Sequence, residues 1–147
     1  YFNVFGRNQN ADNPYAAVIP IFCKSFLNGD SITVNGDGKT SRDFTYIDNV
    51  IQMNELALFT SNHKAKNTIY NCACGEKTSL NEIISYLAEI SQKNVDVVHG
   101  PERKGDIKHS LADITKAKEL LKYDPKVHFK EGLKLSYEYY KKLKNYE

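Results

Sequence analysis

Long apolar runs are missing from this 147-residue sequence. No stretch approaches the ~18 consecutive apolar residues that a membrane-spanning helix needs, and the sequence opens on no signal-peptide pattern. The formal charge is only +2, from 20 Lys and Arg against 18 Asp and Glu, whereas nucleic acids and anionic membranes require a concentrated basic face. We therefore expect a soluble, cytoplasmic protein with no nucleic-acid partner and no membrane partner.

Cysteines are few, and their spacing does not match that of zinc-binding segments. Cys23, Cys72 and Cys74 form an odd set without paired Cys-x-x-Cys motifs. Cys72 and Cys74 lie two residues apart in an apolar segment, so in a strand their side chains would share one face. We interpret all three as buried structural thiols and expect no metal site.

A glycine-rich dinucleotide fingerprint is also missing. The sequence has no G-x-G-x-x-G after its first apolar segment, and Gly36 and Gly38 lie in a turn between two predicted strands. The pattern Tyr-x-x-x-Lys does occur, at Tyr137 and Lys141, but it lies on a helix with an ordinary packing stripe. We interpret this pair as structural and not as the acid–base pair of a dehydrogenase.

What the sequence does contain is an alternation of strand-like and helix-like segments. The predicted strands are 1–5, 31–36, 41–47, 67–75 and 95–100, and the predicted helices are 16–29, 49–61, 80–92, 113–123 and 130–145. We expect 41–47 to pair with 31–36 across a tight turn, and Asp48 and Ser79 to cap the second and third helices. Strands alternating with helices indicate an α/β chain.

Two arginines and an aspartate carry the clearest chemical signal. Arg42 and Arg103 lie 61 residues apart, and guanidinium groups are suited to binding phosphate through paired hydrogen bonds. Asp106 can accept hydrogen bonds from two vicinal hydroxyls, as a carboxylate does for ribose. The alternative is that Arg42 pairs with Asp43 or another acid, and Arg103 with Glu102, in ordinary surface ion pairs.

Four blocks of the sequence carry a family resemblance. They are YFNVFG, YAAVIP, NGDGKTSRDFTYIDNV and GPERKGDIKHSLADITKAKELL. In this order they resemble the C-terminal part of extended short-chain dehydrogenase/reductase enzymes of the NAD-dependent epimerase/dehydratase family, with a likeness to the bacterial UDP-N-acetylglucosamine 4-epimerases. The resemblance implies a small substrate domain over residues 1–147, with elements near 1–6 and 68–74 that belong to the parallel Rossmann-like sheet of an NAD-binding domain absent from this chain.

The resemblance implies an isomerase of nucleotide-sugar metabolism and polysaccharide biosynthesis. NAD would take a hydride from C4 of a UDP-sugar and return it to the other face, and the full-length enzyme would be a homodimer. The catalytic Tyr/Lys pair and most of the NAD site would precede Tyr1, so no catalytic residue is expected in this chain. On its own the chain would expose strand edges and apolar faces, and it would tend to self-associate.

Particular residues match the family's phosphate and sugar contacts. By this resemblance Arg42 and Arg103 would bind the diphosphate, Asp106 the ribose hydroxyls, and Asn3 the diphosphate or sugar. Asn3 is also a polar residue in an apolar strand, where a buried amide must find partners. Ser110 would leave room for a 2-acetamido group beside the sugar, although it also fits a plain packing role.

Other matched positions concern the base and the cofactor. The resemblance places the uridine against Ala17, Val18, Val34, Asn35 and Gly36, and the nicotinamide near Tyr1 and Phe2. Two alternatives remain. One is a different nucleotide-sugar reaction on the same scaffold, by a 4,6-dehydratase, a UDP-glucuronate decarboxylase or a UDP-glucuronate 4-epimerase. The other is a non-catalytic module that senses NAD or a nucleotide.

Overall fold

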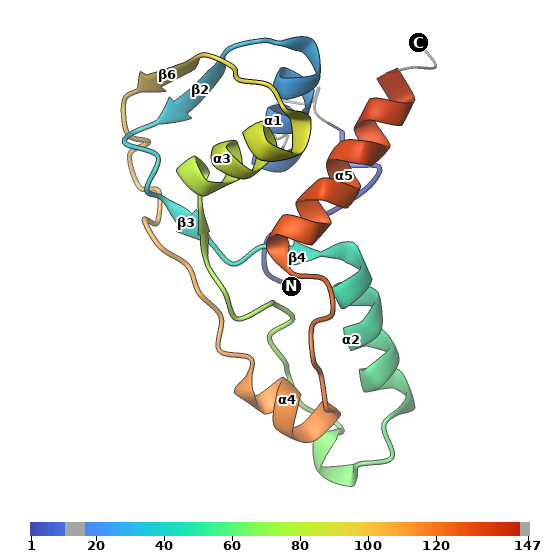
Figure 1. The fold of residues 1–147 in the computed structure, drawn as a ribbon. Coiled ribbons are helices and arrows are strands. Elements are labelled where there is room, and N and C mark those ends of the chain that lie inside the picture. Colours follow the sequence, from blue (N-terminus) through green and yellow to red (C-terminus); the bar gives the residue numbers. More distant parts are fainter. Residues whose placement is uncertain (11–16, 145–147) are drawn as a thin grey trace.

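The computed structural model of the protein describes residues 1–10 and 17–144. Its helices are α1 (Val18–Asn28), α2 (Ile47–Phe59), the 3-10 helix η1 (His63–Ala65), α3 (Leu80–Ser91), α4 (Thr115–Leu121) and α5 (Phe129–Lys144). Its strands are β1 (Val4–Phe5), β2 (Ile32–Asn35), β3 (Ser41–Arg42), β4 (Thr45–Tyr46), β5 (Thr78–Ser79) and β6 (Val97–Gly100). Figure 1 shows α1, α3, β2 and β6 at one end, α4 and the end of α2 at the other, and α5 running away from the centre. The arrangement is α/β, as predicted.

The strands pair in three short ladders. β1 lies parallel to β4, β2 parallel to β6, and β3 antiparallel to β5. The predicted pairing of 31–36 with 41–47 is wrong. Ile32 to Asn35 instead match Val97 to Gly100 in register, and 41–47 divides at Asp43 and Phe44 into two strands with different partners.

The segment 67–75 is not the regular strand that its apolar sequence predicts. Among the described residues it has no assigned strand, and its contact with the first segment is a hydrogen bond from the Phe2 N–H to the Cys72 carbonyl at 3.0 Å. The Cys74 and Gly75 N–H groups point to the Asp43 carboxylate and not to a neighbouring strand. Membership of 1–6 and 68–74 in a larger parallel sheet stays a prediction.

The two predicted helix caps have different outcomes. Ser79 caps α3 as predicted, in a capping box in which the Glu82 N–H donates to Ser79 Oγ at 3.3 Å and the Ser79 N–H to Glu82 Oε2 at 2.8 Å. Pro20 lies in the first turn of α1, where a missing N–H is tolerated. The prediction for Asp48 is wrong, because β4 leads directly into α2, whose cap is Tyr46, and Asp48 lies inside the first turn. The predicted ends at residues 16 and 145 lie outside the described residues.

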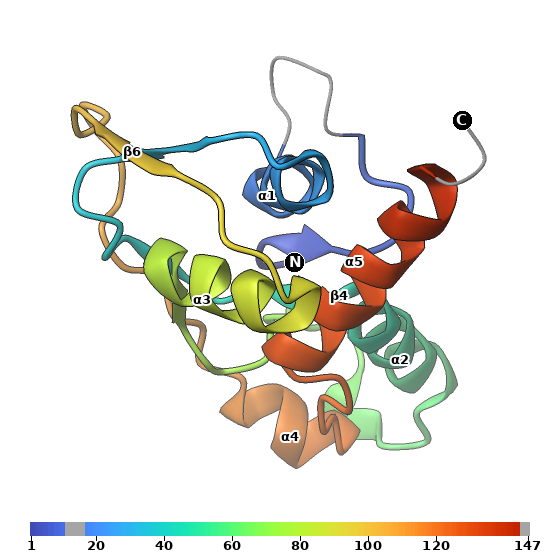
Figure 2. The same ribbon diagram turned by 45° about the horizontal axis from the view of Figure 1, so that its top comes forward.

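Two apolar cores support these elements. The first lies among β1, α1, β2, β4, α3 and α5 and holds Phe5, Phe26, Tyr46 and Leu133. The second lies among α2, η1, the 72–73 segment and α4 and holds Met53. Figure 2 shows α1, α3 and α5 gathered around β1 and β4, with α4 on the far side of α3 from α1. The cores therefore meet where β1 and β4 pair.

Buried side chains agree with the structural interpretations. Cys23, Cys72 and Cys74 are all buried free thiols, and burial raises the pKa of Cys23 to about 12. Tyr137 is 3% exposed and belongs to the first core, while Lys141 is exposed. Burial also raises the pKa of Tyr137, which suits packing and not proton transfer. Among the described helices, none has the length and apolar character required to cross a bilayer.

Candidate functional site

A cavity of about 410 Å³ opens beside the first core. Its floor is apolar and includes Phe5, Phe22 and Phe44. Its volume lies within the roughly 300–1,000 Å³ usual for small-molecule sites. The predicted site residues that line it are Asn3, Ala17, Val18, Asn35, Arg42, Arg103 and Asp106. Folding therefore brings the two arginines and the aspartate to one cavity.

Arg42, at the end of β3, is held by two contacts. Its Nη2 donates to Asp106 Oδ1 at 2.6 Å, and its Nη1 donates to the Ser41 carbonyl at 2.9 Å. The side chains of Arg42 and Asp106 are 22% and 43% exposed. The alternative interpretation, that Arg42 forms an ion pair with an acidic residue, is therefore partly correct. The acid is Asp106, which also lines the cavity.

Arg103 lies on the exposed segment 101–107. No ion pair or side-chain hydrogen bond involves it within the described part of the chain, and its carbonyl accepts the Asp106 N–H at 3.2 Å. Glu102, the partner that the alternative assigned to Arg103, lies 3.4 Å from Lys108 Nζ. The Arg103 guanidinium is therefore available to an anion in the cavity.

Asp43 is the residue whose importance the sequence did not reveal. It is 0% exposed, and its carboxylate accepts the N–H groups of Cys74 at 3.0 Å, Gly75 at 3.0 Å and Ala112 at 3.3 Å. Burial raises the pKa of Asp43, and these backbone donors offset part of the rise. The carboxylate joins the segment after β3, the strand that carries Arg42, to two distant segments, and its position directly before the run FTYI was the available signal.

Asn3 is hydrogen-bonded to the backbone of the same residue, Asp43. Its backbone has a φ of 36°, a left-handed conformation that asparagine tolerates better than most residues. Its Nδ2 donates to the Asp43 carbonyl at 2.8 Å. Asn3 is exposed and lies just before β1, not inside a strand as predicted. It lines the cavity and ties the segment before β1 to the β3–β4 junction.

Three predicted substrate residues are not among those lining the cavity. Val34 is 1% exposed and packs in the first core, because alternate residues of a strand face opposite sides, and it is Thr33 and Asn35 that reach the cavity. Gly36 lies in the turn after β2 with a φ of 75°. Ser110 donates its N–H to the Ser41 carbonyl at 3.1 Å, so it lies beside β3, next to Arg42.

The two residues predicted to lie near the nicotinamide are also outside this cavity. Tyr1 is 73% exposed, and its hydroxyl donates to Asn54 Oδ1 at 2.8 Å. Phe2 is half-buried against the second core. Both lie on the side of the molecule that carries α2.

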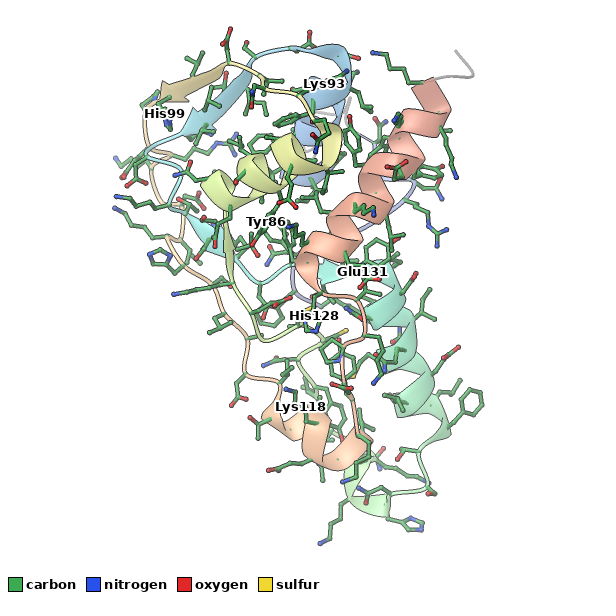
Figure 3. The ribbon with its side chains drawn as sticks, viewed as in Figure 1. Tyr86, Lys93, His99, Lys118, His128 and Glu131 are labelled. Carbon is green, nitrogen blue, oxygen red and sulfur yellow. The ribbon has the colours of Figure 1, made fainter. Side chains whose placement is uncertain are left out.

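Two histidines, His99 and His128, lie outside the residues that line the cavity. Figure 3 shows His99 on β6 and His128 at the start of α5, well apart from each other. His99 Nδ1 lies 2.7 Å from the Gly36 carbonyl, and His128 Nδ1 lies 3.3 Å from Glu76 Oε1. In the parts of the chain that the structure covers, no three His, Cys, Asp or Glu side chains gather as a metal site would require.

Comparisons with known proteins point to one enzyme family. Residues 1–73 match the NAD dependent epimerase/dehydratase family. The chain is 30% identical to a UDP-N-acetyl-alpha-D-glucosaminuronate decarboxylase of Bacillus cytotoxicus, over 99% of this chain and 46% of that protein.

Solved structures show the same relationship. The UDP-glucose 4-epimerase of Thermotoga maritima with UDP-glucose is 38% identical, with a TM-score of 0.89 over 97% of this chain and 45% of that one. The UDP-N-acetylglucosamine 4-epimerase of Methanobrevibacter ruminantium in complex with UDP-N-acetylmuramic acid is 36% identical, with a TM-score of 0.88 over 97% and 45%. The chain belongs to the NAD-dependent epimerase/dehydratase family of extended short-chain dehydrogenases/reductases, and it spans about half the length of these relatives.

Proposed function

We propose that this chain forms the UDP-sugar-binding part of an NAD-dependent 4-epimerase that acts on UDP-N-acetylglucosamine or UDP-glucose. The observation that carries the proposal is the convergence of Arg42, Arg103 and Asp106 on one cavity with an apolar floor. UDP-sugars are bound in the related structures named above, which supports the same ligand class here.

Each polar group at the cavity has a proposed role. The guanidinium groups of Arg42 and Arg103 bind the diphosphate, because planar cations match phosphate oxygens in paired hydrogen bonds. Asp106 accepts hydrogen bonds from the ribose hydroxyls. The start of α1, at Ala17 and Val18, meets the uracil edge, since the first N–H groups of a helix have no partner within it.

The sugar and base contacts rest on positions at the cavity's border. Asn35 lines the cavity, and its neighbours Val34, within β2, and Gly36, in the turn after it, contribute through their backbone. Asn3 contacts the diphosphate or sugar through its carboxamide oxygen, because its Nδ2 is already bound to Asp43. Ser110 admits a 2-acetamido group through its small side chain.

The hydride chemistry would be supplied by NAD when it is bound. The described residues fit the nicotinamide side of an NAD site but not its pyrophosphate side. Tyr1 presents an aromatic ring that is 73% exposed, which suits stacking near a nicotinamide, whereas the sequence contains no glycine-rich turn for the pyrophosphate. Tyr1 and Phe2 are therefore proposed as neighbours of the nicotinamide, and epimerisation as an activity of the whole enzyme, a homodimer.

The direct test is calorimetric titration of the protein with UDP and with uridine. Arg42→Ala and Arg103→Ala should each weaken UDP binding by about 2 kcal/mol, or roughly thirtyfold, and should leave uridine binding nearly unchanged. Lys104→Ala is the matched control, because it removes an adjacent exposed cation that does not line the cavity. Unchanged UDP affinity in both arginine variants would refute the site assignment.

Product analysis distinguishes the reactions open to the family. We expect the full-length enzyme with NAD to interconvert C4 epimers of UDP-N-acetylglucosamine or UDP-glucose. Release of CO2 from a UDP-uronate, the reaction named for the Bacillus cytotoxicus relative, would replace the epimerase proposal by a decarboxylase while leaving the UDP-sugar site in place.

A further inference from the structure

Ser41, in β3, is bonded both to the Arg42 side chain and to residues 108–110. Its carbonyl accepts Arg42 Nη1 at 2.9 Å and the Ser110 N–H at 3.1 Å. Its own N–H donates to the Lys108 carbonyl at 2.8 Å. A single residue therefore holds the guanidinium of Arg42 and a distant part of the chain side by side.

A side-chain contact joins the same two places. Ser41 Oγ lies 2.9 Å from His109 Nδ1, and the two residues also form a parallel bridge. Ser41 is 5% exposed, whereas His109 is exposed. Because a hydroxyl can both donate and accept, this hydrogen bond can form with a neutral or a protonated imidazole. An exposed imidazole is therefore bound to a buried hydroxyl of the strand that carries Arg42.

The position of segment 101–107 depends on how its two ends are attached. At its start, β6 pairs with β2 over four residues. At its other end, the attachment to Ser41 consists of two backbone hydrogen bonds and one side-chain contact. Between these ends the segment is exposed throughout and has no assigned helix or strand. The attachment to Ser41 therefore has a large influence on where Arg103 lies relative to Arg42.

We propose that His109 is a positioning residue for ligand binding, which through Ser41 Oγ keeps the segment that carries Arg103 at the distance from Arg42 that one diphosphate requires. His109 is not among the residues that line the cavity, so it acts through the segment and not by touching the ligand. The inference rests on the proposed function, because it takes a diphosphate as the ligand.

The first test is calorimetric titration of His109→Ala with UDP. Without the side-chain contact, the segment is correctly placed in a smaller fraction of the molecules, and the apparent affinity falls with that fraction. A net hydrogen bond corresponds to about fivefold in an equilibrium constant. Because the two backbone hydrogen bonds to Ser41 remain, we expect UDP to bind about three- to fivefold more weakly.

Conservative variants separate the hydrogen bond from the bulk of the side chain. Asparagine carries polar δ atoms bonded to Cγ, as Nδ1 is in histidine, so His109→Asn can keep the contact with Ser41 Oγ. Its UDP affinity should stay within about twofold of that of the unaltered protein. His109→Leu, which has bulk but no polar atom, should lose as much affinity as His109→Ala.

The partner residue gives an independent test. Ser41→Ala should weaken UDP binding by the same factor as His109→Ala, and the double variant should lose no more than either, because all three lack the same hydrogen bond. His128→Ala is the matched control. It removes another exposed histidine that contacts a side chain, Glu76, and does not line the cavity, so UDP affinity should not change.

Hydrogen exchange tests the attachment without a ligand. The Ser110 N–H should exchange faster in His109→Ala and at the original rate in His109→Asn, because local opening governs exchange. The inference is overturned if His109→Ala binds UDP as tightly as the unaltered protein, if His109→Asn loses as much affinity as His109→Ala, or if the losses at Ser41 and His109 multiply. Failure of the proposed function gives a different result, in which the unaltered protein does not bind UDP while exchange at Ser110 still responds to His109→Ala.

Discussion

Two aspartates beside Arg42 have opposite surroundings. Asp43, the next residue in the chain, is 0% exposed and accepts three backbone N–H groups. Asp106, far away in sequence, is 43% exposed and pairs with the Arg42 side chain. One carboxylate fixes the backbone that carries the arginine, while the other occupies the guanidinium on its open side. Asp43 therefore holds the backbone in a position that should not move, whereas a ligand can replace the contact between Asp106 and Arg42.

The same division extends to the segments around each aspartate. The Asp43 carboxylate joins the β3–β4 junction to Cys74, Gly75 and Ala112, all at buried or half-buried bonds. The segment 101–107 is exposed and holds Arg103 and Asp106 at the cavity. Stability should therefore depend on the Asp43 side, and ligand binding on the Asp106 side.

The largest effect on stability should come from removing the buried carboxylate. Asp43→Ala leaves three backbone N–H groups without their acceptor, and we expect a loss of about 3 kcal/mol in the free energy of unfolding. Asp106→Ala, on the exposed side, should cost under about 1 kcal/mol. Denaturant unfolding measures both values. Equal losses in the free energy of unfolding would contradict the different roles of Asp43 and Asp106.

A smaller difference is expected between two glycines with similar backbones. Gly75 and Gly105 have φ values of 74° and 83°, but a Cβ on Gly75 would lie 3.1 Å from Ile114 Cδ1, whereas one on Gly105 would meet nothing within 4 Å. Gly75→Ala should lower the free energy of unfolding by about 2 kcal/mol, from left-handed strain and crowding. Gly105→Ala should cost about 1 kcal/mol or less. Thermal unfolding of the two variants side by side provides the check, and a reversed order would contradict the packing described around Gly75.

The smallest effect concerns pH. Burial raises the folded-state pKa of Asp43 above its usual 3.8, so between these two values the folded protein binds more protons than the unfolded one. The contribution of Asp43 to stability is then fully present below about 3.8 and decreases as pH rises through the folded-state pKa. The stability of the natural protein relative to Asp43→Asn should therefore be greatest in acid and should fall as pH rises. A relative stability that rises with pH would show that the three N–H donors outweigh burial.

Local sequence signals predicted most elements of the fold but not their pairing. Apolar periodicity located the helices, and the Ser79–Glu82 spacing located the start of α3. The partner of β2 was missed because β6 comes more than 60 residues later in the chain, and no local pattern records a parallel pairing. The segment 67–75 was mistaken for a strand because its apolar residues fit one, whereas the Asp43 carboxylate accepts the N–H groups of Cys74 and Gly75 at its end.

The candidate site was predictable where residue chemistry is distinctive. Arg42, Arg103 and Asp106 stood out by type and by family resemblance, and they line one cavity. The Arg42–Asp106 pair and the hydrogen bonds of the Asp43 carboxylate were not predictable, because both depend on which distant segments fold together. The side chain of Val34, expected against the uridine by family resemblance, packs in the first core, so its proposed contact with the uridine rests on its backbone.

A crystal structure of the protein with UDP would show whether Arg42 and Arg103 bind one diphosphate. We expect diphosphate oxygens within about 3 Å of guanidinium nitrogens of both arginines, with Asp106 moved from Arg42 to the ribose hydroxyls. A UDP molecule whose phosphates contact neither arginine, while Arg42 stays paired with Asp106, would contradict it.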